Sequence, residues 1–111
     1  RDEVARVLYP PLPTDPGHAL FARDFKVGAS LFGLALETED IDAAFRFIDA
    51  LELFGIGSSW GGYESLVAIN RMPLPRAVVP WTEKPFLLRF HVGLEDPDDL
   101  IADLSQALRR I

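Results

Sequence analysis

The clearest hydrophobic pattern in the chain is the two-residue alternation of residues 86–92, which predicts a strand. Alternate side chains of a strand point to opposite faces of its sheet. Shorter apolar runs at residues 30–37, 53–57 and 66–69 are also typical of strands. The predicted faces of the 86–92 strand carry Phe86, Leu88, Phe90 and Val92 on one side and Leu87, Arg89 and His91 on the other.

Two other segments repeat their apolar residues at the spacing of a helix. The first spans residues 40–51 and follows Thr38-Glu39-Asp40, whose side chains suit a helix N-terminus. The second begins at Asp96 as the cap, with Pro97 at the first helical position. The predicted buried stripes are Ile41, Ala44, Phe45, Ile48 and Leu51 in the first helix and Leu100, Ile101, Leu104, Leu108 and Ile111 in the second.

Prolines interrupt these patterns at two places. Those at positions 10, 11, 13 and 16 remove backbone donors, so residues 9–18 are expected to form an extended arm or loop. Those at positions 73, 75, 80 and 85 make residues 70–85 an irregular connection. Residues 2–8 have the pattern of a helix that is ending, and the chain starts at Arg1 rather than at methionine. We therefore expect the sequence to be part of a longer polypeptide.

The predicted order is a strand, a helix, two or three further strands and a second helix, which indicates an α+β fold. We expect a small, mainly antiparallel sheet with the helices on one face. A chain of 111 residues is enough for one domain.

Composition and charge exclude several functional classes. The 17 acidic and 11 basic residues give a net charge of −6, which argues against nucleic acid as a partner. No apolar run approaches the roughly 18 residues of a membrane-spanning helix, so no membrane partner is expected. The lack of cysteine excludes disulfides, a thiol nucleophile and a zinc–thiolate site, and suits a cytoplasmic location. With 2 histidines a multi-histidine site is excluded, so no metal is expected.

Arg89 is a candidate binding residue because it lies in the middle of an otherwise apolar strand. A guanidinium is costly to bury unpaired, and its planar donors suit a carboxylate held by two hydrogen bonds. The alternative is an ion pair with a neighbouring Asp or Glu on a wet sheet face, and the pattern alone leaves both possibilities open. His91, on the same face, is more typical of a hydrogen-bonded structural residue.

The segment from Ser58 to Ser65 is the second candidate. Small residues flank Trp60, so the backbone can approach a ligand while the indole ring forms a wall. On residue type alone, a plain turn with a buried tryptophan is the favoured interpretation. Helix capping explains the acids between Glu95 and Asp99 better than a calcium loop does.

Two motifs together resemble a known family, the bacterial cystathionine β-lyases of pyridoxal-phosphate-dependent (PLP-dependent) Cys/Met metabolism. Residues 59–66 read Ser-Trp-Gly-Gly-Tyr-Glu-Ser-Leu, which is similar to that family's Ser-Trp-Gly-Gly-aromatic-Glu-Ser-Leu signature. Residues 89–104 are similar to the stretch that closes those enzymes. Trp60, and the lack of a His-Pro-Ala segment after it, favour the β-lyase type over relatives that act at Cγ. Ser58 departs from the family, where an aromatic residue commonly precedes the Ser-Trp pair.

The resemblance implies a fold-type-I enzyme of which this is the last part. Residues 1–20 would be a helix end and proline-rich arm leading from a large domain, and residues 21–111 would be the C-terminal α+β domain. The parent would cleave L-cystathionine to homocysteine, pyruvate and ammonia as a cytoplasmic homo-oligomer, expected to be a tetramer. Arg89 would hold the substrate α-carboxylate, and Ser59 and Trp60 would line the substrate side of the pocket.

The same resemblance places the cofactor lysine and the phosphate-binding residues upstream of this segment. Lys26 and Lys84 lack the Ser/Thr-rich context of the family's Schiff-base lysine. We therefore expect this segment alone to hold no catalytic residue, to bind no PLP and to be inactive. The alternatives are a γ-acting or general cysteine-S-conjugate lyase of the same family, or a stand-alone amino-acid-binding domain.

Overall fold

The computed structural model describes residues 1–71 and 80–111. Five strands and three helices form in this part of the chain. The strands are β1 (Val4–Leu8), β2 (Leu31–Leu36), β3 (Gly55–Ile56), β4 (Leu66–Arg71) and β5 (Phe86–His91). The helices are α1 (His18–Asp24), α2 (Ile41–Asp49) and α3 (Pro97–Leu108).

All five strands belong to one sheet, in the order β1-β2-β5-β4-β3. Each pair is antiparallel except β3–β4, which is parallel. The sheet is therefore mixed and mainly antiparallel, and the predicted α+β class is confirmed. The order makes β5 the central strand, with β2 and β4 on either side of it.

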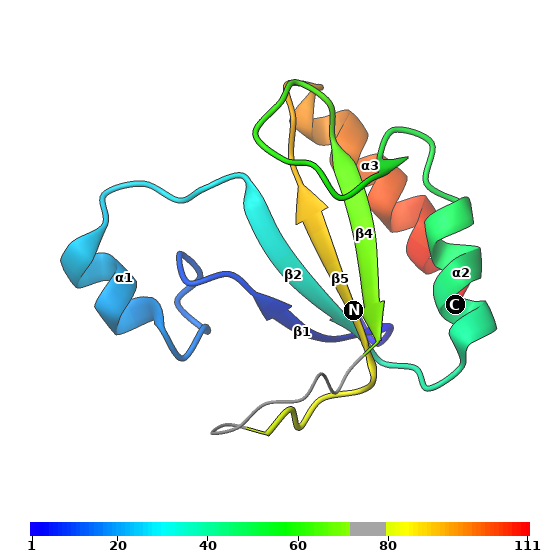
Figure 1. Cartoon of the computed structure of the whole chain (residues 1–111), viewed down its shortest axis with the longest axis horizontal. Coiled ribbons are helices and arrows are strands. Elements are labelled where there is room, and N and C mark those ends of the chain that lie inside the picture. The colour runs from blue at the N-terminus through cyan, green and yellow to red at the C-terminus, as the bar shows by residue number, and fades with distance from the viewer. Residues whose placement is uncertain (72–79) are drawn as a thin grey trace.

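Helices α2 and α3 pack together on one face of the sheet, as predicted, while α1 stands apart from it beyond β2 (Figure 1). The core lies between the sheet and α2 and α3, and α1 contributes no buried residue to it. Packing of apolar side chains between the two layers supplies the main stabilisation of such a fold. The largest fully buried apolar side chains are Phe47, Phe86, Phe90, Leu36, Leu88 and Val67.

Both predicted helix starts are confirmed. The Asp96 carboxylate accepts a hydrogen bond of 2.8 Å from the Asp98 amide at the start of α3. The Asp40 carboxylate accepts one of 2.9 Å from the Asp42 amide at the start of α2. Each bond satisfies an amide that the first turn of a helix leaves without a partner.

The prediction that residues 2–8 end a helix is wrong, because Val4–Leu8 form the edge strand β1, paired with β2. A short apolar run has no reliable period, and here pairing with β2 decides the conformation. The expected arm also ends in a helix that was not predicted. Helix α1 has no side-chain cap and no buried residue, so neither of the usual helix signals is present.

Both predicted helical stripes need correction. In α2 the core side chains are Ala43, Ala44, Phe47 and Ile48. Phe45, expected in the core, is 46% exposed. Aromatic residues at both 45 and 47 allow two phases of the helix, and packing against the sheet selects Phe47. In α3, Ile101 is 61% exposed. Strand β4 also extends to Arg71, so the irregular connection begins later than predicted, and residues 72–79 lie outside the described residues.

Candidate functional site

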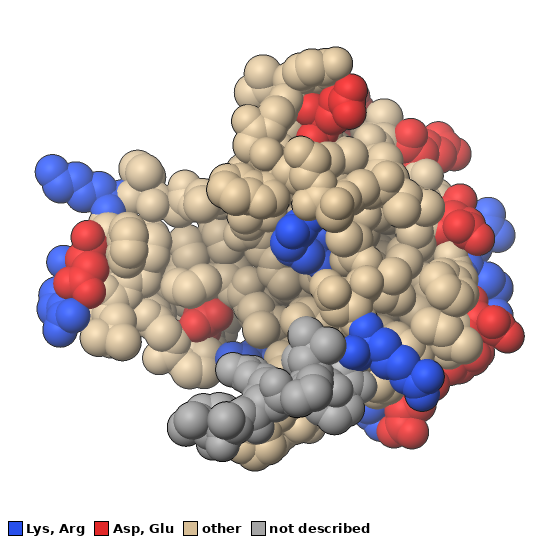
Figure 2. All heavy atoms as spheres, viewed as in Figure 1, with Lys and Arg blue, Asp and Glu red and all other residues tan. Residues whose placement is uncertain are grey.

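Arg89 lies on the central strand, on the sheet face opposite the core. Its cross-strand neighbours are Gly33 of β2 and Ala68 of β4. Neither neighbour has a side chain long enough to cover the guanidinium from the side. In Figure 2 a basic patch near the centre of the view is bordered by uncharged atoms, and the acidic atoms lie mainly along the rim.

The guanidinium of Arg89 contacts backbone carbonyls and no carboxylate in the described parts of the chain. Its Nη2 donates to the carbonyl oxygen of Ser58 at 2.5 Å and to that of Ser59 at 3.4 Å. Its Nε is buried without a hydrogen-bond partner among the described residues. Residues 72–79 contain no Asp or Glu. The alternative of an ion pair with a neighbouring acid is therefore not observed for Arg89.

Another arginine on the sheet shows what the paired state is like. Arg6, on the edge strand β1, forms an ion pair with Glu83 at 3.4 Å. A buried donor with no partner costs free energy, so a native protein that keeps one commonly uses it at a site. The donor set of Arg89 suits a planar anion such as a carboxylate.

The loop of residues 58–65, called the Ser58–Ser65 loop below, lies along β5 and its extension. Arg89 contacts the beginning of the loop through the carbonyls of Ser58 and Ser59. His91 contacts the middle of the loop, with 3.0 Å between its Nε2 and the carbonyl oxygen of Gly62.

Glu95 holds the end of the same loop. Its carboxylate accepts bonds from the amide of Ser65 at 2.8 Å and from the Ser65 hydroxyl at 2.7 Å. The hydroxyl bond from Ser65 is the main cause of a lowered pKa of Glu95, helped by the amides of Ser65 and of Glu95 itself. Glu95 is therefore a carboxylate near neutral pH.

Sequence reasoning missed this role of Glu95, because the acid was assigned to the helix start. It also missed Ser30, which contacts His91. The available signal was the two-residue spacing of positions 89, 91, 93 and 95. That spacing places Arg89 and His91 on one side of β5, and Gly93 and Glu95 follow just after the strand ends.

The structure brings Ser59 to Arg89 through its backbone and leaves Trp60 exposed. Trp60 is 62% exposed, so the interpretation of a plain turn with a buried tryptophan is wrong. Trp60 directly follows Ser59, whose carbonyl oxygen Arg89 contacts. The substrate-binding functions of Arg89, Ser59 and Trp60 stay predictions.

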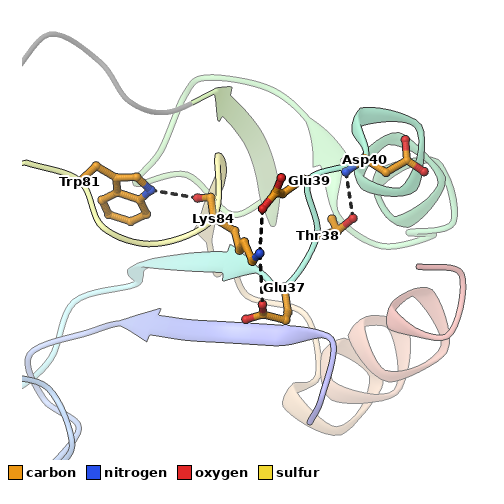
Figure 3. A network of polar contacts seen from close by, with 6 residues as sticks. All are labelled: Glu37, Thr38, Glu39, Asp40, Trp81 and Lys84. Carbon is orange, nitrogen blue, oxygen red and sulfur yellow. Dashed lines mark hydrogen bonds and ion pairs between the residues drawn. The ribbon is translucent and has the colours of Figure 1, made fainter.

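Neither lysine of this chain fits a PLP site. Lys84 forms a bond of 2.8 Å with Glu39 and lies 3.9 Å from Glu37 (Figure 3). The hydrogen bond with Glu39 raises the pKa of Lys84, which keeps its amine charged and unsuited to forming an imine. Lys26 is exposed in the connection between α1 and β2 and offers no enclosure for a cofactor. Lys26 and Lys84 therefore do not fit the role of the lysine that binds PLP.

The described residues provide neither a metal site nor a membrane-spanning helix. Within them, no group of three or more His, Asp or Glu side chains could hold a metal ion. None of the helices in residues 1–71 and 80–111 has the length and apolar character needed to cross a membrane.

Comparison with known proteins gives matches over nearly the whole chain. The profile of the family described as Cys/Met metabolism PLP-dependent enzyme matches residues 1–109. A cystathionine beta-lyase from Bordetella avium is 47% identical over 111 residues, which are 99% of this chain and 28% of the relative. An L-alanine/L-glutamate racemase from Wolbachia pipientis wMel is 40% identical over 98% of this chain and 28% of its own length.

A solved structure of a related enzyme matches the fold of this chain. The cystathionine gamma synthase from Xanthomonas oryzae pv. oryzae, in complex with cystathionine, superposes with a TM-score of 0.81 at 34% identity. The match covers 99% of this chain and 30% of that one. This chain therefore spans less than a third of the length of the relatives it matches.

Proposed function

Because the chain belongs to the family of PLP-dependent enzymes of Cys/Met metabolism, we propose that it is the substrate-side, C-terminal domain of a longer carbon–sulfur lyase. In this proposal residues 1–20 lead from a large domain, and Arg89 binds the α-carboxylate of the amino-acid substrate. The cofactor belongs to the rest of the parent chain, since the residues present here do not fit it.

The observation that carries the proposal is the state of Arg89. Among the described residues, its Nε has no hydrogen-bond partner and no carboxylate contacts the guanidinium, which faces away from the core. The names of the relatives give the class of ligand, because cystathionine, alanine and glutamate are all amino acids. The group that these molecules share, whatever bond is broken, is an α-carboxylate next to an amine. An arginine that binds this group serves every reaction of the family.

Ser59 and Trp60 complete the substrate side in this proposal. Ser59, whose backbone carbonyl contacts Arg89, would bind the same carboxylate through its hydroxyl, and the exposed indole of Trp60 would form a wall. The relative from Bordetella avium favours cleavage of L-cystathionine at Cβ to homocysteine, pyruvate and ammonia. We place the parent in the cytoplasm as a homotetramer.

The fold match to a cystathionine gamma synthase supports a second candidate, an enzyme acting at Cγ. The products from L-cystathionine distinguish the two candidates. Cleavage at Cβ releases pyruvate with homocysteine, whereas cleavage at Cγ releases cysteine with 2-oxobutanoate. One assay of the two keto acids therefore decides between them.

The test of the carboxylate role compares two arginines of one sheet in the full-length polypeptide that contains this segment. Arg89→Lys and Arg89→Ala should lower kcat/KM for cystathionine about a hundredfold or more, because charge-assisted bonds to the substrate are lost. The matched control is Arg6→Ala, which removes an arginine already paired with Glu83 and should leave kcat/KM nearly unchanged. Equal activity of the Arg89 variants and the control would reject the proposed role.

A second measurement tests whether the PLP site of the parent lies outside this segment. Mixing the 111-residue chain with PLP should give no imine absorption band and no keto acid from cystathionine. A stoichiometric imine band would contradict the assignment of the cofactor to another part of the polypeptide.

A further inference from the structure

We propose that His91 is a positioning residue that fixes the Ser58–Ser65 loop against β5 and thereby orients the carboxylate-binding face of Arg89. This inference rests on the proposed function of Arg89. No motif in the sequence singled out His91 for such a role, and the interpretation from its residue type was that of an ordinary structural histidine.

The imidazole of His91 joins two segments that are far apart in the sequence. It is 2% exposed, and its two nitrogens point to different partners. Nε2 lies 3.0 Å from the carbonyl oxygen of Gly62, and Nδ1 lies 3.0 Å from the hydroxyl of Ser30. A carbonyl oxygen only accepts, so Nε2 carries the proton and Nδ1 accepts from the Ser30 hydroxyl.

The amide of Gly61 makes a third contact with the same ring. Its nitrogen lies 3.2 Å from Nε2 and 3.4 Å from Nδ1. Because it is nearly equidistant from the two nitrogens, this N–H faces the ring rather than the lone pair of one nitrogen. The imidazole therefore holds both peptide groups of the Gly61-Gly62 pair.

This part of the loop has little else to hold it. Gly61 has a φ of +82°, a conformation that glycine adopts readily. A Cβ atom added at Gly61 or at Gly62 would meet no described atom within 4 Å. Trp60 and Tyr63, on either side, are 62% and 70% exposed, so packing does not fix them. A glycine pair without packing has high conformational freedom, and the His91 contacts are what reduce it.

The contacts of His91 with Gly61 and Gly62 affect Arg89 through the loop backbone. The guanidinium is oriented by the carbonyls of Ser58 and Ser59, which lie three and two residues before Gly61. The end of the loop is fixed separately, by Glu95 at Ser65 and by the amide of Leu94, which donates to the Tyr63 carbonyl at 2.9 Å. Without His91 the loop would remain attached at its end while the carbonyls that orient Arg89 became mobile.

The experiment uses variants of the 111-residue chain, with backbone order and carboxylate binding measured by NMR. In the unaltered chain, Gly61 and Gly62 should have order parameters near those of rigid backbone, about 0.85. In His91→Leu both values should fall below about 0.6 while those of β5 stay unchanged. Acetate, titrated against the Nε–H resonance of Arg89, should bind about fivefold more weakly to this variant.

Two further variants separate positioning from simple packing. His91→Gln retains a side-chain N–H that can reach the Gly62 carbonyl, so it should restore both the order parameters and the acetate affinity. Ser30→Ala removes only the partner of Nδ1, at an exposed position, and should give a smaller loss of order at Gly61 and Gly62. The Ser30→Ala variant also tests the role of His91 if His91→Leu fails to fold.

The outcomes are distinct for the two proposals. Unchanged order at Gly61 and Gly62 in His91→Leu, or a His91→Gln variant as disordered as His91→Leu, would overturn the positioning role. If His91→Leu does not fold, unchanged order at Gly61 and Gly62 in Ser30→Ala would overturn it instead. A rigid loop with no acetate binding in the unaltered chain would count against the function of Arg89 alone, since the order parameters do not depend on the ligand.

Discussion

The even-numbered and odd-numbered residues of β5 face two different environments, although they belong to the same strand. Phe86, Leu88 and Phe90 are at most 1% exposed and pack under α2 and α3. On the other face, Arg89 and His91 contact the loop that follows β3. The core contacts of the first face are apolar and close-packed, whereas those of the second are hydrogen bonds to a loop backbone.

Under the proposed role of Arg89, one face of the strand stabilises the fold and the other face binds the substrate. Close-packed apolar side chains stabilise the fold and leave no group free for a ligand. The opposite face retains the Nε of Arg89, a buried donor without a partner in residues 1–71 and 80–111, which costs stability and is useful only if something binds there. Substitutions on the two faces should therefore have different consequences, and the predictions below follow in order of expected effect on stability.

The largest effect is expected for Leu88→Ala on the covered face. Leu88 is fully buried at the centre of the core, so the change removes buried apolar surface and leaves a cavity. The free energy of unfolding should fall by about 2–5 kcal/mol. Urea unfolding followed by circular dichroism measures it, and a loss below about 1 kcal/mol would mean that this face is not the main source of stability.

A smaller effect is expected for Asp103→Asn, which alters the buried acid of α3. The Asp103 carboxylate is 5% exposed and accepts bonds from the amides of Glu52 and Leu53, at 2.9 and 2.8 Å. Gln106 donates a third at 3.0 Å. An amide nitrogen in place of one oxygen leaves a donor facing a donor, so the free energy of unfolding should fall by about 1–3 kcal/mol.

The pH dependence gives a second check on Asp103. Burial, the largest single influence, raises its pKa, but the hydrogen bonds from Glu52, Leu53 and Gln106 together outweigh it, and the pKa is lowered. A lowered pKa in the folded state means that the charged acid stabilises the fold above its unfolded pKa, about 3.9. That stabilisation is lost as the pH falls through the folded value. The difference in stability between Asp103→Asn and the unaltered chain should therefore shrink below about pH 4.

On the open face, Arg89→Met should leave the free energy of unfolding unchanged or raise it by up to about 1 kcal/mol. The change removes a buried Nε that has no partner among the described residues, and this gain offsets the loss of the Nη2 bonds to the carbonyls of Ser58 and Ser59. Methionine keeps an unbranched side chain as far as the position of Nε. Arg6→Met is the matched control on β1, and it should lower stability slightly because the ion pair with Glu83 is lost. A clear loss of stability in Arg89→Met alone would show that this arginine is structural and would weaken the contrast between the faces.

The covered face could be predicted from the sequence better than the open face. The alternation in residues 86–92 correctly placed Phe86, Leu88 and Phe90 on the core side, and Asp96-Pro97 correctly marked the start of α3. Both signals are local, because each depends on neighbouring residues. Local sequence did not determine which side of α2 faces the sheet. Phe45 and Phe47 both fit the helical spacing, and only packing against the sheet decided between them.

On the open face, residue type pointed to Arg89 as a candidate but left its partner undecided. The partner depends on which strands lie beside β5 and on where the Ser58–Ser65 loop returns, and neither follows from local pattern. His91 shows the same limit, because its contacts with Ser30 and Gly62 join residues separated by 61 and 29 positions. Strand β1 was mistaken for a helix end for a related reason, since its conformation depends on pairing with β2.

The smallest effect is expected from the ion pairs of Lys84, which are exposed and belong to neither face of β5. Lys84 contacts Glu39 and Glu37 across the corner between β2 and α2 (Figure 3). Exposed pairs gain little because water and salt screen them, so Lys84→Met should not change the midpoint of urea unfolding measurably. Repeating the measurement at low salt and at 1 M salt checks the reason, since any residual difference should vanish at high salt. A difference that survives high salt would mean that packing of the Lys84 side chain, rather than its charge, holds the corner. The covered face of β5 would then not be the only main source of stability among the described residues.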